Sequence, residues 1–135
     1  MRKFLFLIAA TLAAPGAHAV TPDDLLRGYA RQARADLPGY AGPSADTGHR
    51  FFTARHSDWS CASCHTSDPG RPGRHAVTGK SIEPLAPASN AARFRDLAHA
   101  EKWFKRNCND TLGRACTAAE KADVLAYLLT IRRGT

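Results

Sequence analysis

The sequence predicts an all-α protein in which helices are joined by loops rich in proline and glycine. Helix-start signals recur along the chain, and each is followed by apolar residues at helical spacing. No segment shows the period-two alternation of a strand. The chain of 135 residues falls within the range of one domain.

The first 19 residues have the three parts of a secretory signal peptide. Two basic residues open the chain, residues 4–12 are almost wholly apolar, and Ala17 and Ala19 are the small residues that a signal peptidase reads. A membrane anchor is the alternative, but about ten apolar residues are half of what a spanning helix needs. We therefore expect cleavage after Ala19 and a periplasmic mature domain, residues 20–135, that is not embedded in the membrane.

The mature chain is moderately basic. Of the 19 basic and 12 acidic residues in the sequence, two basic ones belong to the leader, which leaves a formal charge of +5. The basic residues are scattered, without a long run or interleaved aromatics, so we expect no nucleic-acid partner. A solvated basic surface explains this charge, and an acidic partner protein stays open as an alternative.

The first predicted helix begins at Thr21. The Thr21 hydroxyl can cap it, Pro22 suits its first position, and the two carboxylates that follow face the positive end of the helix dipole. A short amphipathic helix through Leu25 and Tyr29 should follow. The prolines and glycines of residues 38–43 then end it.

A second helix is expected to start at Ser44 and Asp46 and to carry Gly48 and Phe52. Residues 69–73 and 84–87 are then expected to form loops that are neither strand nor long helix.

A third helix is predicted after a turn that begins at residues 89–90 and carries Phe94. Apolar residues of the segment 97–106 repeat at helical spacing. Its basic residues suit the negative end of a helix: Lys102, Lys105 and Arg106.

The last helix has the clearest signal. Thr117 and Glu120, three residues apart, form a capping box. Apolar residues follow at helical spacing: Ala122, Leu125, Ala126, Leu128 and Leu129.

The four cysteines form two unlike pairs. Cys61 and Cys64 are three residues apart and are followed at once by His65, whereas Cys108 and Cys116 are eight apart without an adjacent histidine. Because cysteine thiols seldom stay free in an oxidising compartment, we expect all four cysteines to be covalently bonded. The two pairs therefore predict different chemistry.

The segment Cys61-Ala62-Ser63-Cys64-His65 matches the attachment motif of c-type haem in every defined position. Two thiols on one helical turn can form thioethers with the two vinyl groups of haem, and the next residue then offers an imidazole to the iron. A thioredoxin-like redox pair and half of a zinc site are the alternatives. The first lacks its parallel sheet, and the second lacks another nearby pair of soft ligands. The motif therefore predicts one covalent haem c with His65 as proximal ligand.

Three further residues resemble the helix contact of class I cytochromes c. In that fold the first and last helices cross closely, and Gly48, Phe52 and Tyr127 match the glycine and aromatic residues of the crossing. Three unrelated core residues are the alternative. Together with the haem motif, the likeness predicts a class I cytochrome c-like single domain around one haem.

The sixth iron ligand is not methionine, because the only methionine is Met1 in the leader. Histidine is the chemical default, since imidazole suits iron in either oxidation state. Composition does not choose among the candidates, which are His75, Lys80, His99, Lys102, Lys105, Asn107 and Asn109.

The second half of the sequence is more distinctive. Its characteristic segments are Glu101-Lys102-Trp103, Arg106-Asn107-Cys108-Asn109, Gly113-Arg114, Cys116-Thr117 and Glu120-Lys121-Ala122-Asp123. They resemble the sphaeroides haem protein (SHP) family of c-type cytochromes. Shorter segments extend the likeness: Gly28-Tyr29, Gly79-Lys80, Pro84-Leu85-Ala86-Pro87 and Arg93-Phe94. It covers most of residues 22–130 and is weakest between Asp36 and Ser60.

The resemblance implies an asparagine as distal iron ligand. The matching position is Asn107, with Asn109 as a near miss, and an Asn107 that merely caps its helix is the alternative. The resemblance also implies a disulfide between Cys108 and Cys116. The loop-entropy relation gives such a bridge roughly 2.5 kcal/mol of stabilisation.

These expectations lead to a functional hypothesis. An amide oxygen is a hard donor that favours ferric iron, so reduction should free the iron to bind oxygen, nitric oxide or another diatomic molecule. We expect a monomeric electron-transfer and gas-binding protein rather than an enzyme. The resemblance suggests a multi-haem cytochrome c or a membrane cytochrome b as redox partner.

Two other functions stay open. One is a haem enzyme that reduces oxygen, peroxide or nitrogen oxides, in which only His75 or His99 could supply the proton-handling group. The other is a plain six-coordinate electron shuttle.

Overall fold

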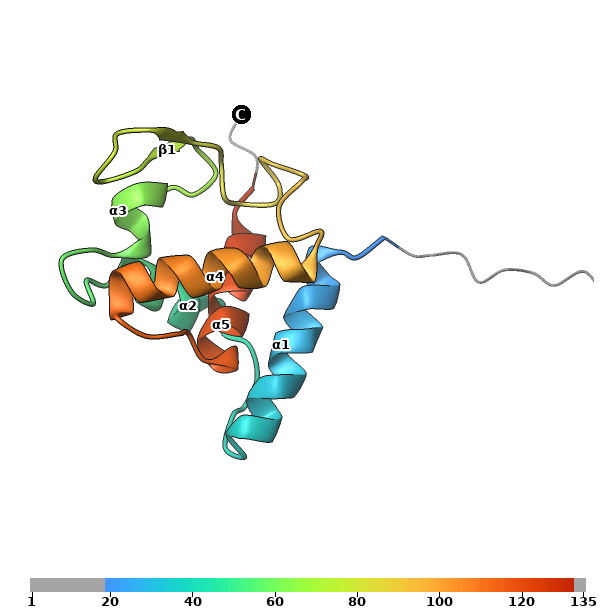
Figure 1. Cartoon of the computed structure of the whole chain (residues 1–135). Helices are drawn as coiled ribbons and strands as arrows, with labels where there is room; N and C mark the ends of the chain where they lie inside the picture. Colours follow the sequence, from blue (N-terminus) through green and yellow to red (C-terminus); the bar gives the residue numbers. More distant parts are fainter. Residues whose placement is uncertain (1–18, 133–135) are drawn as a thin grey trace, which may run out of the picture.

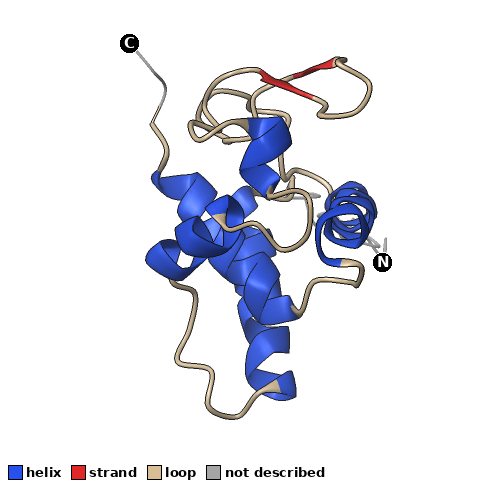
Figure 2. Ribbon diagram, turned by 90° about the vertical axis from the view of Figure 1, so that its left-hand side faces the viewer, coloured by secondary structure: helices blue, strands red, loops and turns tan. Residues whose placement is uncertain are grey.

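The computed structural model describes residues 19–132 and contains five helices and one small sheet (Figures 1 and 2). The helices are α1 (Pro22–Asp36), α2 (Ala45–Thr53), α3 (Cys61–His65), α4 (Leu97–Leu112) and α5 (Ala118–Thr130). Strands β1 (Gly73–Arg74) and β2 (Ser81–Ile82) pair in antiparallel fashion. The all-α prediction is confirmed. The predicted leader lies outside the described residues apart from Ala19.

Three helix starts lie where the sequence predicts them. Thr21 caps α1 and forms a capping box with Asp24, Ser44 caps α2, and Thr117 forms a capping box with Glu120 at α5. In each case the side-chain oxygen accepts a hydrogen bond from a backbone N–H of the first turn, which would otherwise have no partner.

The prediction that the third helix spans residues 97–106 is too short. Helix α4 is capped by Asp96 and continues to Leu112. Its last turn is held by the Thr111 hydroxyl, which donates to the Asn107 carbonyl at 2.8 Å, and it ends at Gly113 with a φ of 68°. Residues 107–110 are asparagine, cysteine and aspartate residues, which have low helix propensity, so the sequence did not predict this extension.

The loop prediction for residues 69–73 is wrong at its last residue. Gly73 pairs with Ile82 and Arg74 with Ser81, so a hairpin with strands of two residues each forms where no strand was expected. Figure 1 shows this hairpin next to α3 and on the far side of α3 from α5.

Helix α5 lies at the centre and packs on α1 and α2. A Cβ atom on Gly48 of α2 would lie 1.9 Å from the carbonyl oxygen of Asp123 in α5, so the two helices approach as closely as glycine allows. The rings of Phe52 and Tyr127 are 5.5 Å apart beside this contact. The predicted crossing through Gly48, Phe52 and Tyr127 is confirmed.

Helix α4 crosses in front of α5 in Figure 1, and side chains join it to α5 and α1. Glu101 accepts two hydrogen bonds from Lys121 of α5, at 2.7 and 2.9 Å, and Phe104 meets the ring of Tyr29 edge-on at 5.8 Å. None of the helices within residues 19–132 combines the length and hydropathy that a membrane span requires.

Candidate functional site

The short helix α3 brings together the two cysteines and the histidine of the predicted haem motif. It begins with a capping box between Ser60 and Ser63, in which each side chain accepts a hydrogen bond from the other residue's backbone N–H. Cys61 and Cys64 are free thiols and half-buried. Since residues three apart share a face of a helix, both thiols are available to a single group next to α3.

Burial controls the protonation of this motif. It raises the pKa of the Cys61 thiol to about 11. It lowers the pKa of His65 to about 4, and the positive charge of Arg93 adds to the effect. His65 is therefore a neutral imidazole at neutral pH, which is the form that binds a metal.

The β1–β2 hairpin packs directly on α3. A Cβ on Gly73 would lie 2.0 Å from the carbonyl oxygen of Cys64 and 3.1 Å from the Cα of His65. The Ala76 N–H donates to the Cys64 sulfur at 3.3 Å. Thr66, directly after His65, adopts a φ of 63°, which non-glycine residues rarely do. The backbone is thus tightly constrained on both sides of the predicted iron ligand.

Gly73→Ala is expected to destabilise the protein, because its new methyl group meets backbone atoms that cannot rotate away. Overpacking of this kind costs about 1–3 kcal/mol. Urea unfolding measures the change, and Gly39→Ala is the control, because no heavy atom lies within 4 Å of a Cβ at that position. Equal stabilities of the two variants would contradict the packing of the hairpin on α3.

The candidates for the distal ligand differ in their place on α4. Asn107 shares one face of the helix with Ala100, Phe104 and Thr111, at spacings of three and four residues. Ala100 and Thr111 are 7% and 8% exposed, so this face points inward, yet Asn107 itself is exposed. Asn107 is therefore an exposed residue in line with buried ones on the same face of the helix.

The other candidates are placed less favourably. Lys102, Lys105 and Asn109 lie on other faces of α4 and are exposed. The Nε2 atom of His99 accepts a hydrogen bond from the Trp103 indole at 2.9 Å.

Two candidates belong to the hairpin. Nδ1 of His75 accepts hydrogen bonds from the backbone N–H groups of Val77 and Thr78, at 3.3 and 3.2 Å. Lys80 is exposed near the end of the same turn.

The second cysteine pair forms a disulfide. Cys108 and Cys116 are bonded, with Cα atoms 5.6 Å apart, as the resemblance implied. The bridge joins the residue after Asn107 to the residue before the cap of α5.

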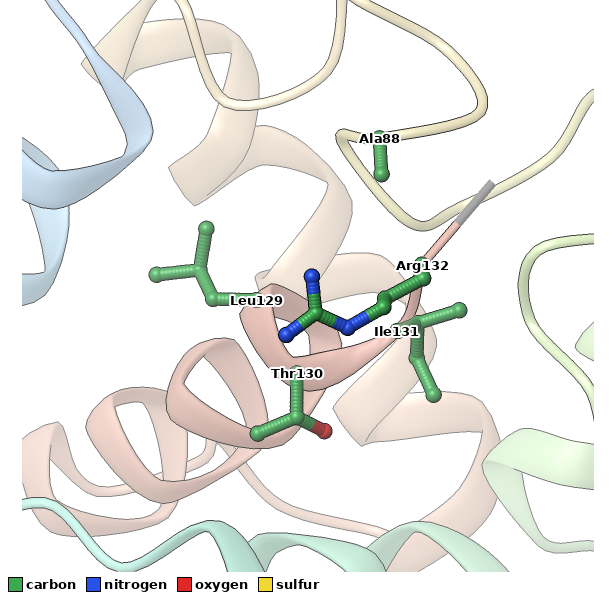
Figure 3. Close-up of a pocket in the computed structure, with 5 residues that line it drawn as sticks. All are labelled: Ala88, Leu129, Thr130, Ile131 and Arg132. Carbon is green, nitrogen blue, oxygen red and sulfur yellow. The ribbon is translucent and has the colours of Figure 1, made fainter. Parts of the chain in front are cut away.

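The cavities of the described part of the chain include the following two. One, of about 480 Å³, lies at the end of α5, where the Arg132 side chain reaches back toward Leu129 (Figure 3). None of the residues that line it is a predicted haem ligand. The other, of about 390 Å³, lies between the loop of residues 83–96 and the start of α4.

Comparison with known proteins assigns the chain to a family. Residues 38–128 match a sequence family described as a domain of unknown function (DUF1924). The cytochrome c-type protein SHP of Cereibacter sphaeroides is 42% identical over 134 residues, which are 95% of this chain and 98% of that protein. Cytochrome c'' of Methylophilus methylotrophus is 42% identical over 118 residues, 84% of this chain and 82% of that protein. The chain belongs to the SHP and cytochrome c'' family.

Solved structures of this family have the same fold. The crystal structure of oxidised M. methylotrophus cytochrome c'' matches with a TM-score of 0.75 and 41% identity, over 84% of this chain and 97% of that one. The structure of oxidised SHP, described as an oxygen-binding cytochrome c, matches with a TM-score of 0.74 and 39% identity, over 84% and 99%. This SHP-family chain is therefore a mono-haem c-type cytochrome with a cytochrome c fold, and its cofactor is haem c.

The residues of the SHP-family chain fit that cofactor. Of its four cysteines, two are joined in a disulfide and the other two are free on one face of α3. His65 follows them as a neutral imidazole. The close contact of Gly73 with α3 and the partial burial of Arg93 could not be predicted from the sequence, because neither residue belongs to a recognisable sequence motif.

Proposed function

We propose that this family member is a periplasmic electron-transfer and gas-binding protein. Cys61 and Cys64 hold haem c through thioethers, His65 is the permanent axial ligand, and Asn107 is a reversible one. Residues 1–19 form the cleaved leader, and residues 20–135 form the working domain.

The position of Asn107 carries this proposal. A polar side chain that is exposed between buried neighbours, on the inward face of a helix, suits a ligand for a group lying next to that helix. Helical spacing turns Lys102, Lys105 and Asn109 away from that face. The disulfide after Asn107 supports it by fixing this turn of α4 to the start of α5.

The donor set explains a reversible axial bond. Haem, when bound, supplies an iron that changes oxidation state and takes a sixth ligand. His65 is held neutral by burial and can bind iron in both states. The Asn107 amide oxygen is a hard, neutral donor, so it binds ferric iron better than ferrous iron and detaches on reduction.

Two descriptions of relatives support this behaviour. The solved SHP is called an oxygen-binding cytochrome c, and the solution structure of M. methylotrophus cytochrome c'' is described as giving insights into haem-ligand detachment. For this chain we propose oxygen, nitric oxide or another diatomic molecule as ligand. Its redox partner is a multi-haem cytochrome c or a membrane cytochrome b.

Spectroscopy of the protein purified from a bacterial periplasm tests the proposal. We expect a mature chain that starts at Val20 and carries one covalent haem by mass spectrometry. Reduction should remove the sixth ligand, and carbon monoxide added to the reduced protein should bind rapidly and completely. A ferrous form that stays six-coordinate and does not bind carbon monoxide would contradict gas binding, and the protein would then be an electron carrier only. A chain without the mass of haem would end the proposal.

A further inference from the structure

An ion pair joins the first half of α4 to α5. The Lys121 ammonium donates to both carboxylate oxygens of Glu101, at 2.7 and 2.9 Å. Among the ion pairs found within residues 19–132, this one joins two different helices. The Lys121 side chain is 16% exposed and the Glu101 side chain 42%. Water therefore screens this pair less than it screens a pair exposed on both sides.

Two aromatic rings lie beside the Lys121 ammonium. Its nitrogen is 5.5 Å from the centre of the Tyr29 ring, which belongs to α1, and 6.0 Å from the centre of the Phe104 ring, which belongs to α4. The face of an aromatic ring attracts a cation at these distances. The two rings also meet each other edge-on. One ammonium group therefore links α1, α4 and α5 at a single point.

Three contacts of α4 with its neighbours lie along one line of the helix. Glu101, Phe104 and Cys108 are spaced by three and four residues, so they share a face. The first forms the ion pair with α5, the second packs on α1, and the third is bonded to the residue before the cap of α5. Asn107 lies beside this line, between the ion pair and the disulfide. Both contacts therefore fix its position relative to α5.

The segment between Glu101 and Asn107 is a continuous stretch of helix. At a rise of 1.5 Å per residue, the two residues are about 9 Å apart along the helix axis. Between residues 97 and 107 only Ala100 is buried. Because so little buried surface fixes the first turns of α4, loss of the ion pair would let them move, and the helix would carry that movement to Asn107.

We propose that Glu101 and Lys121 are positioning residues for the distal ligand: their ion pair keeps this part of α4 fixed to α5 and so strengthens the reversible axial bond of Asn107. The inference rests on the proposed role of Asn107. Neither member of the pair touches the cofactor. Loss of the pair should therefore weaken the axial bond of the ferric protein and leave the ferrous protein, in which the proposed mechanism has Asn107 detached, unaffected.

Imidazole binding to the ferric holoprotein measures the strength of this bond, because imidazole must displace Asn107 from the iron. Lys121→Met keeps most of the apolar side chain and removes the charge. We expect its ferric affinity for imidazole to rise about fivefold or more, as is usual for two coupled sites. The affinity of the reduced protein for carbon monoxide should not change, and amide hydrogen exchange in residues 98–107 should become faster. Lys121→Arg restores the charge and should restore both ferric measurements.

Double variants show whether the effect passes through Asn107. In the Asn107→Ala background there is no distal side chain to displace, so Lys121→Met should add no change in imidazole affinity. A disturbance of the haem site that does not involve Asn107 would change the affinity in both backgrounds. Equal changes in the two backgrounds would therefore overturn the inference.

Arg114→Gln is the matched control. Arg114 donates two hydrogen bonds to the Glu120 carboxylate, at 2.7 and 2.9 Å, as Lys121 does to Glu101, but it lies beyond the end of α4 at Gly113. Its loss should leave both ligand affinities unchanged. An equal rise of imidazole affinity in Arg114→Gln and Lys121→Met would reduce the effect to a general loss of ion pairs and overturn the inference.

The outcomes separate this inference from the proposed function. If Asn107→Ala leaves the ferric spectrum unchanged, the proposed distal ligand is wrong and this inference with it. If Asn107→Ala opens the ferric iron but Lys121→Met leaves the imidazole affinity unchanged, the inference alone is overturned. Should Lys121→Met not fold, Glu101→Gln decides by the same measurement.

Discussion

Asn107→Ala is expected to retain covalent haem while its ferric iron loses the sixth protein ligand. Alanine offers no donor atom, so water should take the position in the ferric state. The ferrous state should be unchanged, because the proposed mechanism has Asn107 detached from ferrous iron. Absorption and electron paramagnetic resonance spectra of the ferric protein measure the change. Because Asn107 is exposed, its loss should change the free energy of unfolding by only about 0.5 kcal/mol.

The matched control for this variant is Asn109→Ala. Asn109 is the same residue type, two positions further along α4, and it is exposed on another face of the helix. Its ferric spectrum should equal that of the unmodified protein. If the spectrum of Asn107→Ala is unchanged instead, the distal ligand is His99, Lys80 or Asn109, and variants of these residues would identify it.

Gly48→Val is expected to prevent folding or to leave a protein that unfolds at low urea concentration. Its Cβ would meet the carbonyl oxygen of Asp123 at 1.9 Å, the carbonyl carbon at 2.4 Å and the Val124 nitrogen at 2.9 Å. These are backbone atoms, so relief requires α2 and α5 to separate. The loss of unfolding free energy should exceed that of ordinary overpacking, which is about 1–3 kcal/mol. It would remove a large share of the total stability of a domain, which is about 5–15 kcal/mol.

Gly28→Ala provides the control for the effect of removing a glycine from a helix. Gly28 lies within α1, and the only heavy atom near its Cβ position is the mobile end of the Arg31 side chain, at 4.0 Å. This variant should gain about 0.5–1 kcal/mol, because alanine is the better helix former. Two variants of equal stability would show that the α2–α5 crossing is not close.

Much of the fold could be predicted because local signals and packing agree. Thr21, Ser44 and Thr117 are helix caps whose side chains accept hydrogen bonds from backbone N–H groups three residues further on, so their role can be predicted from the local sequence. Gly48 could be assigned to a helix crossing only through its likeness to class I cytochromes c, since the residue it contacts is distant in the sequence.

Other features depend on contacts that a sequence does not display. The extension of α4 beyond Arg106 relies on the disulfide at Cys108 and on the left-handed conformation of Gly113, which outweigh weak helix propensity. The strands of the β1–β2 hairpin are only two residues long each, and the hairpin is positioned by its contact with α3.

The candidate site divides in the same way. Cys61, Cys64 and His65 are adjacent in the sequence, so their chemistry could be predicted directly, and α3 places them together. Asn107 was suggested by resemblance alone. Its exposed position on the inward face of α4 now gives a physical argument that composition could not supply.

The Cys108–Cys116 disulfide also bears on how the protein is assembled. Four cysteines allow three ways of forming two disulfides, and the proposed thioethers require that one pair stay reduced until haem arrives. A ring of so few residues closes readily, because its ends meet at little entropic cost. Early closure of this ring would remove two thiols from competition and leave Cys61 and Cys64 as the two thiols available to the vinyl groups.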